Sequence, residues 1–192
     1  KLSVTGDIHG DVFLLFGMTE SMSDEEMLFV AGDFGMFWYD TKICQEKMLI
    51  INDILESKNS YIVFVDGNHD NHRFLNSQEV SNFYGAKSHK LMTRIIHIMR
   101  GEILRIDDIK IFCFGGAYSV DRFWRVKNET YFEEELPNQE EYDNGIMNLK
   151  RSNMKVDYIL THTCPRSLVE KLGARQCDRR GKIAKLYSMG NR

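Results

Sequence analysis

Three short apolar runs near the start of the chain each lead into a glycine with an acidic or amide side chain beside it. Residues 2–5, 27–31 and 61–65 form the runs. The blocks that follow are Gly6-Asp7-Ile8-His9-Gly10, Gly32-Asp33-Phe34-Gly35 and Asp66-Gly67-Asn68-His69-Asp70. Carboxylate, amide and imidazole groups bind divalent cations, and a mixture of them suits Mn²⁺, Fe or Zn²⁺ better than Ca²⁺. The absence of thiolates argues against a structural zinc site. The blocks therefore indicate metal-dependent chemistry.

Two later apolar runs end in a similar way. Residues 110–114 lead into Gly115-Gly116-Ala117, and residues 156–160 lead into Thr161-His162-Thr163-Cys164-Pro165. The last block adds an imidazole to the donors of the first three. Together the blocks supply most of a ligand set for two divalent metals, namely Asp7, His9, Asp33, Asn68 and His162.

Such a ligand set suits the hydrolysis of a phosphate ester. Two cations about 3.5–4 Å apart can clamp a phosphate and turn a bridging water into hydroxide near neutral pH. A carboxylate is the natural bridge because its negative charge offsets the repulsion between the ions. The leaving alkoxide needs a proton or a positive neighbour, and an imidazole titrates in the right range.

The spacing of these blocks predicts a parallel sheet that brings them together. The runs are rich in β-branched and aromatic residues, as buried parallel strands are. A helix is expected to start near Asp11, and apolar residues at helical spacing predict another over residues 40–57, capped by Asp40 or Thr41. The order β-α-β-α-β favours parallel pairing, and open α/β sheets place their sites at the carboxyl ends of the strands.

The second half predicts a further sheet. Residues 94–100 and 102–106 alternate in polarity, which indicates strands with one solvated face, and Asp107-Asp108 suits a hairpin turn. Residues 121–138 predict a long surface loop. Helices are expected over residues 139–151 and after Pro165. Two mixed sheets stacked face to face with helices outside, a four-layer αββα sandwich, would accommodate both halves.

Composition limits the classes of protein. The chain has 192 residues and a net charge of −3, which fits one globular domain over residues 1–192 without a general attraction to nucleic acid. It shows neither an apolar segment of about 20 residues nor a signal-peptide pattern, so no membrane partner is expected. The four cysteines have no CxxC or framework spacing, which favours a reducing, cytoplasmic location without disulfides.

The ordered set of blocks resembles the calcineurin-like metallophosphoesterases. Four blocks match, from Gly6-Asp7-Ile8-His9-Gly10 through Gly32-Asp33 and Gly67-Asn68-His69-Asp70 to Thr161-His162, so the resemblance covers most of the chain. Gly115-Gly116-Ala117 looks like a variant of small bacterial and phage members. The resemblance implies an αββα sandwich with two divalent metals, first of all Mn, with Fe, Zn or Mg as alternatives.

The resemblance also implies roles for individual residues. Asp7 and His9 would hold the first metal, Asp33 would bridge both metals, and Asn68 and His162 would hold the second. His69 would face the leaving-group oxygen, with Asp70 beside it to orient the ring. The implied activity is hydrolysis of a phosphomonoester or phosphodiester by a metal-bridging hydroxide, without a covalent phosphoenzyme.

Two departures from the family pattern bear on these expectations. Gly32-Asp33-Phe34-Gly35-Met36 lacks the Asp-Arg-Gly extension of the Ser/Thr protein phosphatases, which argues against a phosphoprotein substrate. The chain also lacks the later Gly-His-x-His block and ends instead in the basic stretch 175–192. Either the chain is C-terminally truncated or each metal has lost one ligand.

Other interpretations remain open at this point. The protein could be a degenerate binding module with the same fold, or a nuclease, although no basic groove with interleaved aromatics favours nucleic acid as a partner. His97 is expected to be structural and His72 and His89 solvated. Arg73, Arg100 and Arg122 are expected to be surface ion-pair partners. The phosphorylated substrate and the oligomeric state stay undetermined.

Overall fold

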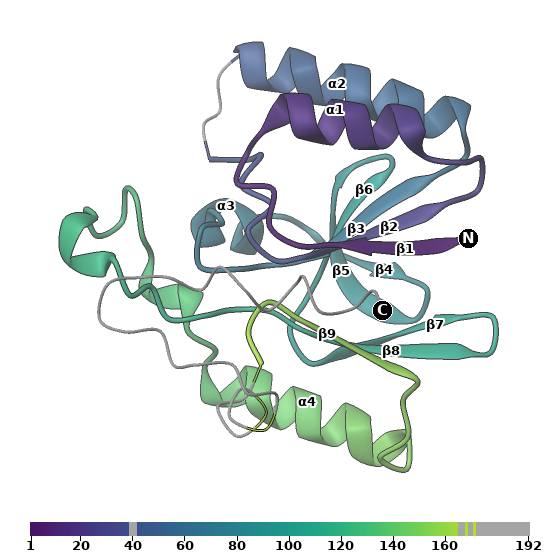
Figure 1. The fold of residues 1–192 in the computed structure, drawn as a ribbon. Coiled ribbons are helices and arrows are strands. Elements are labelled where there is room, and N and C mark those ends of the chain that lie inside the picture. Colours follow the sequence, from purple (N-terminus) through teal and green to yellow (C-terminus); the bar gives the residue numbers. More distant parts are fainter. Residues whose placement is uncertain (39–41, 165–167, 169–170, 172–192) are drawn as a thin grey trace.

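The protein is built from two β-sheets that stack face to face, with helices on both outer faces (Figure 1). The computed structural model describes residues 1–38, 42–164, 168 and 171. The larger sheet has six strands in the order β1-β2-β3-β6-β5-β4, and the smaller has three in the order β7-β8-β9. Both sheets mix parallel and antiparallel pairs. The predicted αββα sandwich of two mixed sheets is therefore confirmed.

The first part of the chain forms the predicted parallel unit. Its elements are β1 (Leu2–Thr5), α1 (Val12–Ser21), β2 (Met27–Ala31), α2 (Lys42–Ser57) and β3 (Tyr61–Val65). β1 pairs with β2 and β2 with β3, all parallel and in register, so that their carboxyl ends lie at one edge. The Asp11 carboxylate caps α1 by accepting hydrogen bonds from the backbone of Phe13 and Leu14. The cap expected at Asp40 or Thr41 lies outside the described residues.

A hairpin that the sequence pattern did not predict completes the larger sheet. After α3 (His72–Asn76) come β4 (Val80–Phe83) and β5 (Ala86–Met92), joined at Tyr84-Gly85. Both turn residues have positive φ, 48° for Tyr84 and 81° for Gly85, as a tight two-residue hairpin turn requires. β6 (Ile95–Ile98) then pairs antiparallel with β5 and parallel with β3.

The smaller sheet follows. β7 (Glu102–Ile106) and β8 (Ile109–Phe114) form the predicted hairpin around Asp107-Asp108, and β9 (Tyr158–Thr161) joins β8 in parallel. Between β8 and β9 the chain forms two short 3-10 helices, η1 (Arg122–Trp124) and η2 (Glu133–Glu135), and α4 (Gln139–Arg151). α4 begins with a capping box of Asn138 and Glu141.

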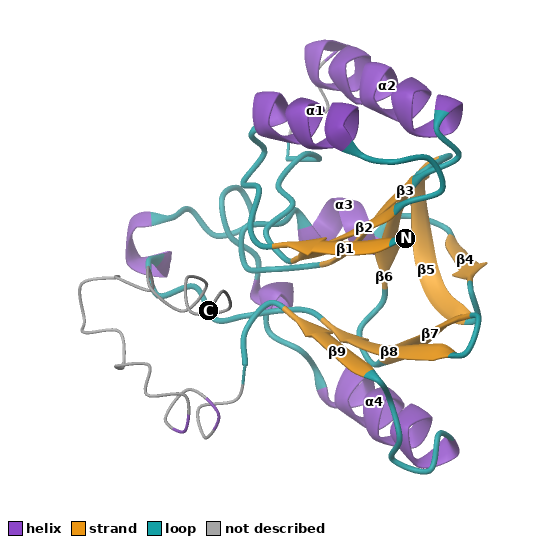
Figure 2. Ribbon diagram, turned by 45° about the vertical axis from the view of Figure 1, so that its right-hand side comes forward, coloured by secondary structure: helices purple, strands orange, loops and turns teal. Residues whose placement is uncertain are grey.

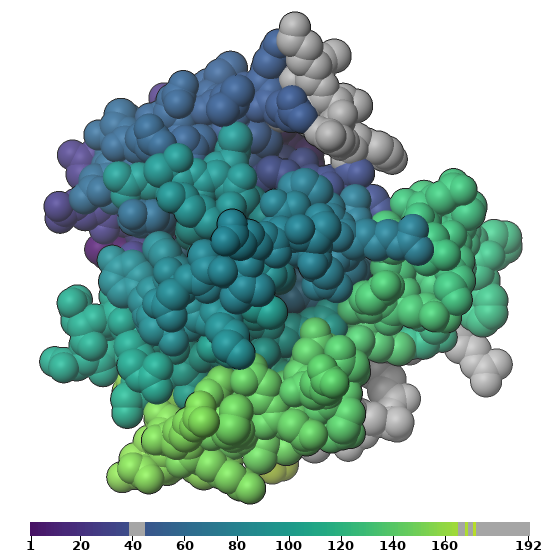
Figure 3. Space-filling view, turned by 180° about the vertical axis from the view of Figure 1, so that it is seen from behind, coloured from purple at the N-terminus to yellow at the C-terminus, as the bar shows by residue number. Residues whose placement is uncertain are grey.

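Two apolar cores separate the layers. Alternate residues of the central strands face opposite sides, so Leu28 and Val30 pack under α1 and α2, whereas Phe29 and Ala31 pack between the sheets. Figure 2 shows α1 and α2 above the larger sheet and α4 outside the smaller one. From behind, the yellow-green residues of α4 cover the lower face (Figure 3).

Three expectations about solvent exposure are wrong. All four residues of β6 and all of β7 except Arg105 are buried, so these strands have no solvated face of the kind predicted. β6 lies inside the larger sheet, and His97 satisfies its polar atoms there by bonding to Asp66 and His89. His72 and His89, expected to be solvated, are also buried.

Some expectations concern parts of the chain outside the description. The helix expected after Pro165 and the basic stretch 175–192 lie outside the described residues. No helix in the described ranges is long and apolar enough to span a bilayer.

Candidate metal centre

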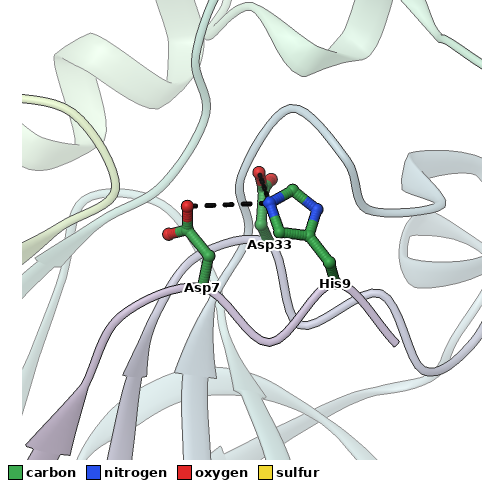
Figure 4. Close-up of side chains that lie close together, drawn as sticks. All are labelled: Asp7, His9 and Asp33. Atoms are coloured by element: carbon green, nitrogen blue, oxygen red, sulfur yellow. Dashed lines mark ion pairs between the residues drawn. The ribbon is translucent and has the colours of Figure 1, made fainter. Parts of the chain in front are cut away.

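The loops after β1 and β2 bring Asp7, His9 and Asp33 together (Figure 4). One ligand atom from each residue lies within 4.8 Å of those of the other two. His9 Nε2 is 3.7 Å from an Asp7 oxygen and 3.5 Å from Asp33 Oδ2. Asp7 and His9 are exposed and Asp33 is buried, so the group lies at the surface above the sheet edge.

Asp33 connects all of the loops at this edge. Its backbone carbonyl accepts hydrogen bonds from Ile8 N at 3.1 Å and His9 N at 2.8 Å, which fixes the first block to the second. Its Oδ1 accepts a hydrogen bond from His69 N at 2.6 Å, which fixes the third block. Its Oδ2 lies 3.5 Å from both His9 Nε2 and His162 Nε2. Asp33 Oδ2 thus faces the imidazole of His9 on one side and that of His162 on the other.

Two residues of the site have a strained backbone, and two nearby glycines leave room for neighbouring side chains. His9 and Asp33 have φ of 50° and 48°, a left-handed conformation that is costly for residues with a side chain and that occurs at functional sites. A Cβ on Gly32 would overlap the His162 ring, and one on Gly67 would overlap Asp33. Both glycines are therefore needed for the loops to approach one another closely.

His162 and Asn68 form the second group of donors. His162 Nδ1 lies 2.8 Å from the carbonyl of Ala31, which can only accept, so Nδ1 carries a proton, and in the neutral form of the ring Nε2 has a free lone pair. That Nε2 is 3.2 Å from Asn68 Oδ1 and 3.5 Å from Asp33 Oδ2. Three lone pairs thus converge without a hydrogen-bond donor between them. This is the arrangement expected of ligands around a cation, with Ala31 fixing the tautomer of the histidine.

Two residues from the loop after β8 orient Asn68. Asn68 Nδ2 donates to Ser119 Oγ at 3.1 Å, so the amide oxygen must point toward His162. The Ser119 hydroxyl donates in turn to Glu135 at 2.6 Å, and Glu135 also accepts from Ser119 N and from Arg122. Ser119 and Glu135 are fully buried. The sequence pattern gave no sign of either residue, because both lie in what it read as a surface loop or its flank.

The predicted partnership of His69 and Asp70 is not seen. The Asp70 carboxylate accepts hydrogen bonds from the backbone of Phe34, Gly35 and Gly67, and it makes none to the His69 ring among the described residues. Its contacts instead support a role in fixing the loops after β2 and β3. Burial raises the pKa of Asp70 to about 6, with Asp33 and Asp66 adding to the shift and the backbone hydrogen bonds opposing it.

His69 itself lies at the site. Its ring packs edge-on against His9 with centroids 5.0 Å apart, and its Nε2 is 3.9 Å from Asp121. Burial lowers the pKa of His69, and Arg125 and His9 lower it further, while Asp33 and Asp121 act in the opposite direction. His69 is therefore surrounded by groups of both charges.

A buried ion pair between Asp66 and Arg100 fixes the start of the loop that carries Asn68 and His69. Asp66 accepts two hydrogen bonds from Arg100, at 2.6 and 2.9 Å, and one from His97 at 3.2 Å. Burial alone would raise the pKa of Asp66, but Arg100 and His97 hold it well below its usual range. Arg100 was expected to be a surface ion-pair partner and is buried instead. The pair holds Asp66 in place directly before Gly67 and Asn68.

Fold and site together define an α/β protein with carboxylate, imidazole and amide groups gathered at the carboxyl edge of its larger sheet. The chain belongs to the calcineurin-like phosphoesterase family, whose model matches residues 1–186. Members of the family are metal-dependent phosphoesterases that generally bind two divalent ions. A search of curated proteins gave no match.

Proposed function

We propose that this protein hydrolyses a phosphomonoester or phosphodiester at a centre of two divalent metals. The observation that supports the proposal best is the position of Asp33 Oδ2, at 3.5 Å from both His9 Nε2 and His162 Nε2. Bound cations would bind the phosphoryl oxygens and supply a hydroxide nucleophile from water near neutral pH. The donor set of carboxylate, imidazole and amide favours Mn²⁺, with Fe, Zn²⁺ or Mg²⁺ as alternatives.

The residues divide the work as follows. Asp7 and His9 would hold one cation, Asn68 and His162 would hold the other, and Asp33 would serve both. His69 lies next to His9 at the border of the site, which suits it to donate a proton or a hydrogen bond to the departing oxygen. Asp70 stays out of the chemistry and holds the loops that carry Asp33 and Asn68.

The experiment is an assay of the full chain loaded with Mn²⁺. Metal content is measured by plasma mass spectrometry, and hydrolysis is followed with p-nitrophenyl phosphate and bis(p-nitrophenyl) phosphate. Turnover of either ester that is abolished in Asp33→Asn and retained in Lys90→Gln, an exposed lysine on β5, supports the proposal. Two bound metals without turnover of either ester would replace it with a binding module of the same fold.

A further inference from the structure

A cavity of about 400 Å³ opens beside the candidate metal centre and shares His9 and His69 with it. Its other walls come from the start of α1, residues 35–38 after β2, α2, and the loop between η1 and η2. Figure 1 shows that loop, in green, on the side of the molecule where the strands of the parallel unit end. A volume of this size is typical of sites for small organic ligands.

One part of the cavity wall is apolar and rigid. Val12, Met36, Trp38 and Met48 line it. The Trp38 indole is held in place because its Nε1 donates to the His69 carbonyl at 2.6 Å and its ring stacks on Phe132, with centroids 5.7 Å apart. Phe132 stacks on the indole and the Arg125 guanidinium lies 6.0 Å from its centroid, so an aromatic group would stack on the part of the ring that these two side chains leave open.

The rest of the wall includes two cationic side chains. Lys47 and Arg125 line the cavity, and none of the described residues that line it is acidic. The Arg125 side chain is 10% exposed, and its Nη1 donates to Ser119 Oγ at 2.7 Å. Asp121 lies 3.6 Å from the same nitrogen and offsets part of its charge. A guanidinium fixed in this way is suited to bind a phosphate or carboxylate.

We infer that this cavity binds the leaving group of the substrate, and that the leaving group is a nucleoside phosphate, so that the bond broken in a nucleoside diphosphate is a phosphoanhydride rather than an ester. The inference rests on the proposed function for the reaction itself. His69, the residue placed to serve the departing oxygen, lines the cavity, so the bond that breaks lies at its entrance. The base would lie against Trp38, and the second phosphate would reach Arg125 and Lys47.

The reaction balances without any further reactant. For a nucleoside diphosphate, the oxygen of water forms a new bond to the terminal phosphorus. The bond between that phosphorus and its bridging oxygen breaks, and the oxygen leaves with the electron pair and takes up a proton by way of His69. The products are inorganic phosphate and a nucleoside monophosphate.

The binding test does not depend on hydrolysis. AMP, adenosine and ribose 5-phosphate are titrated by calorimetry into the full chain loaded with Mn²⁺ and into the same chain after chelation. We expect AMP to bind at least about tenfold more tightly than either fragment in both preparations, because it alone fills both parts of the cavity. Arg125→Met should weaken AMP binding about 10- to 100-fold, the loss expected for a charge-assisted contact. Arg105→Met, an exposed arginine on β7, should not change it.

The kinetic test compares substrates. Phenyl phosphate is the control substrate, because its leaving group is aromatic but carries no second anion. The ratio of kcat/KM for ADP to kcat/KM for phenyl phosphate should fall at least about tenfold in Arg125→Met and in Lys47→Glu. AMP binding no tighter than adenosine, or an unchanged ratio in both variants, overturns the inference while leaving the phosphoesterase proposal intact. If AMP binds as expected but no ester is hydrolysed, the proposed function fails and the cavity assignment stands.

Discussion

The amide nitrogen of Asn68 donates to the hydroxyl of Ser119 at 3.1 Å, and this contact determines which end of the amide faces the candidate metal centre. Ser119 can accept that hydrogen bond because its own proton goes to Glu135, at 2.6 Å. The oxygen of Asn68 is thereby left facing His162 Nε2, at 3.2 Å. Two buried residues, Ser119 and Glu135, thus set the orientation of one proposed metal ligand.

Ser119→Ala should therefore weaken one metal site and spare the other. Without the hydroxyl the Asn68 amide can rotate, and loss of a contact that orients a ligand typically costs about 10- to 100-fold in metal affinity. Calorimetric titration of the metal-free chain with Mn²⁺ measures both sites. Ser77→Ala, which removes an exposed hydroxyl bonded to Phe74 O, is the matched control. Unchanged affinity at both sites in Ser119→Ala would show that Asn68 needs no such support.

His69→Gln should reduce turnover without removing metal. A glutamine can still donate a hydrogen bond but cannot transfer a proton, and loss of general acid catalysis typically costs about 10²- to 10⁴-fold in kcat. The measurement is kcat for p-nitrophenyl phosphate together with metal content. Aryl phosphates have good leaving groups, so the loss should be larger for an alkyl phosphate. An equal loss for both esters would argue that His69 acts by binding the phosphate.

Asp70→Asn should destabilise the fold. The carboxylate accepts three backbone hydrogen bonds, and an amide nitrogen placed against any of those N–H groups would lose at least one of them. The expected loss in the free energy of unfolding is about 2 kcal/mol at pH 7.5, measured by urea denaturation. If stability is unchanged and the pH profile of kcat moves instead, Asp70 acts on His69 as the family resemblance implied.

His89 should make the protein less stable in mild acid. Burial lowers the pKa of His89 to about 4, with His97 adding to the shift and Asp66 opposing it, whereas the unfolded chain titrates near 6.5. Between these values the unfolded state binds the extra proton. The stability that His89 contributes is therefore complete above about pH 6.5 and is lost as the pH falls toward 4.

The test is a comparison of the chain with His89→Gln. Between pH 7 and pH 4.5 the free energy of unfolding should fall by up to about 2.5 kcal/mol more in the unsubstituted chain than in the variant. Carboxylates titrate equally in both proteins and cancel in the difference. Parallel curves would show that His89 keeps an ordinary pKa despite its burial.

Much of the candidate site could be predicted from local patterns in the sequence. Each ligand block follows an apolar run, and parallel strands in register bring their carboxyl ends to one edge, so Asp7 and Asp33 had to meet. The hairpin at Asp107-Asp108 was predicted for a similar reason, because turn residues between two apolar runs act locally. The hairpin of β4 and β5 was missed because polar residues such as Ser81, Asn82 and Lys87 interrupt its apolar residues, although β4 does alternate in exposure in the structure.

Tertiary structure decided what supports the site. Ser119 lies 51 residues from Asn68, and Arg100 lies 34 residues from Asp66. No period in the sequence marks such partners, since Arg100 reaches Asp66 only once β6 pairs with β3, and Ser119 reaches Asn68 only once the loop after β8 has folded over the loop after β3. His97 and His89 pair across β6 and β5 on the face of the larger sheet opposite the smaller one, and their sequence neighbours gave no reason to expect a buried pair.

Sequence alone determined which donors the chain offers, because strand-forming runs and their end residues are local properties. The stacking of the sheets decided how those donors are oriented and what lies behind them, because orientation depends on contacts between distant segments.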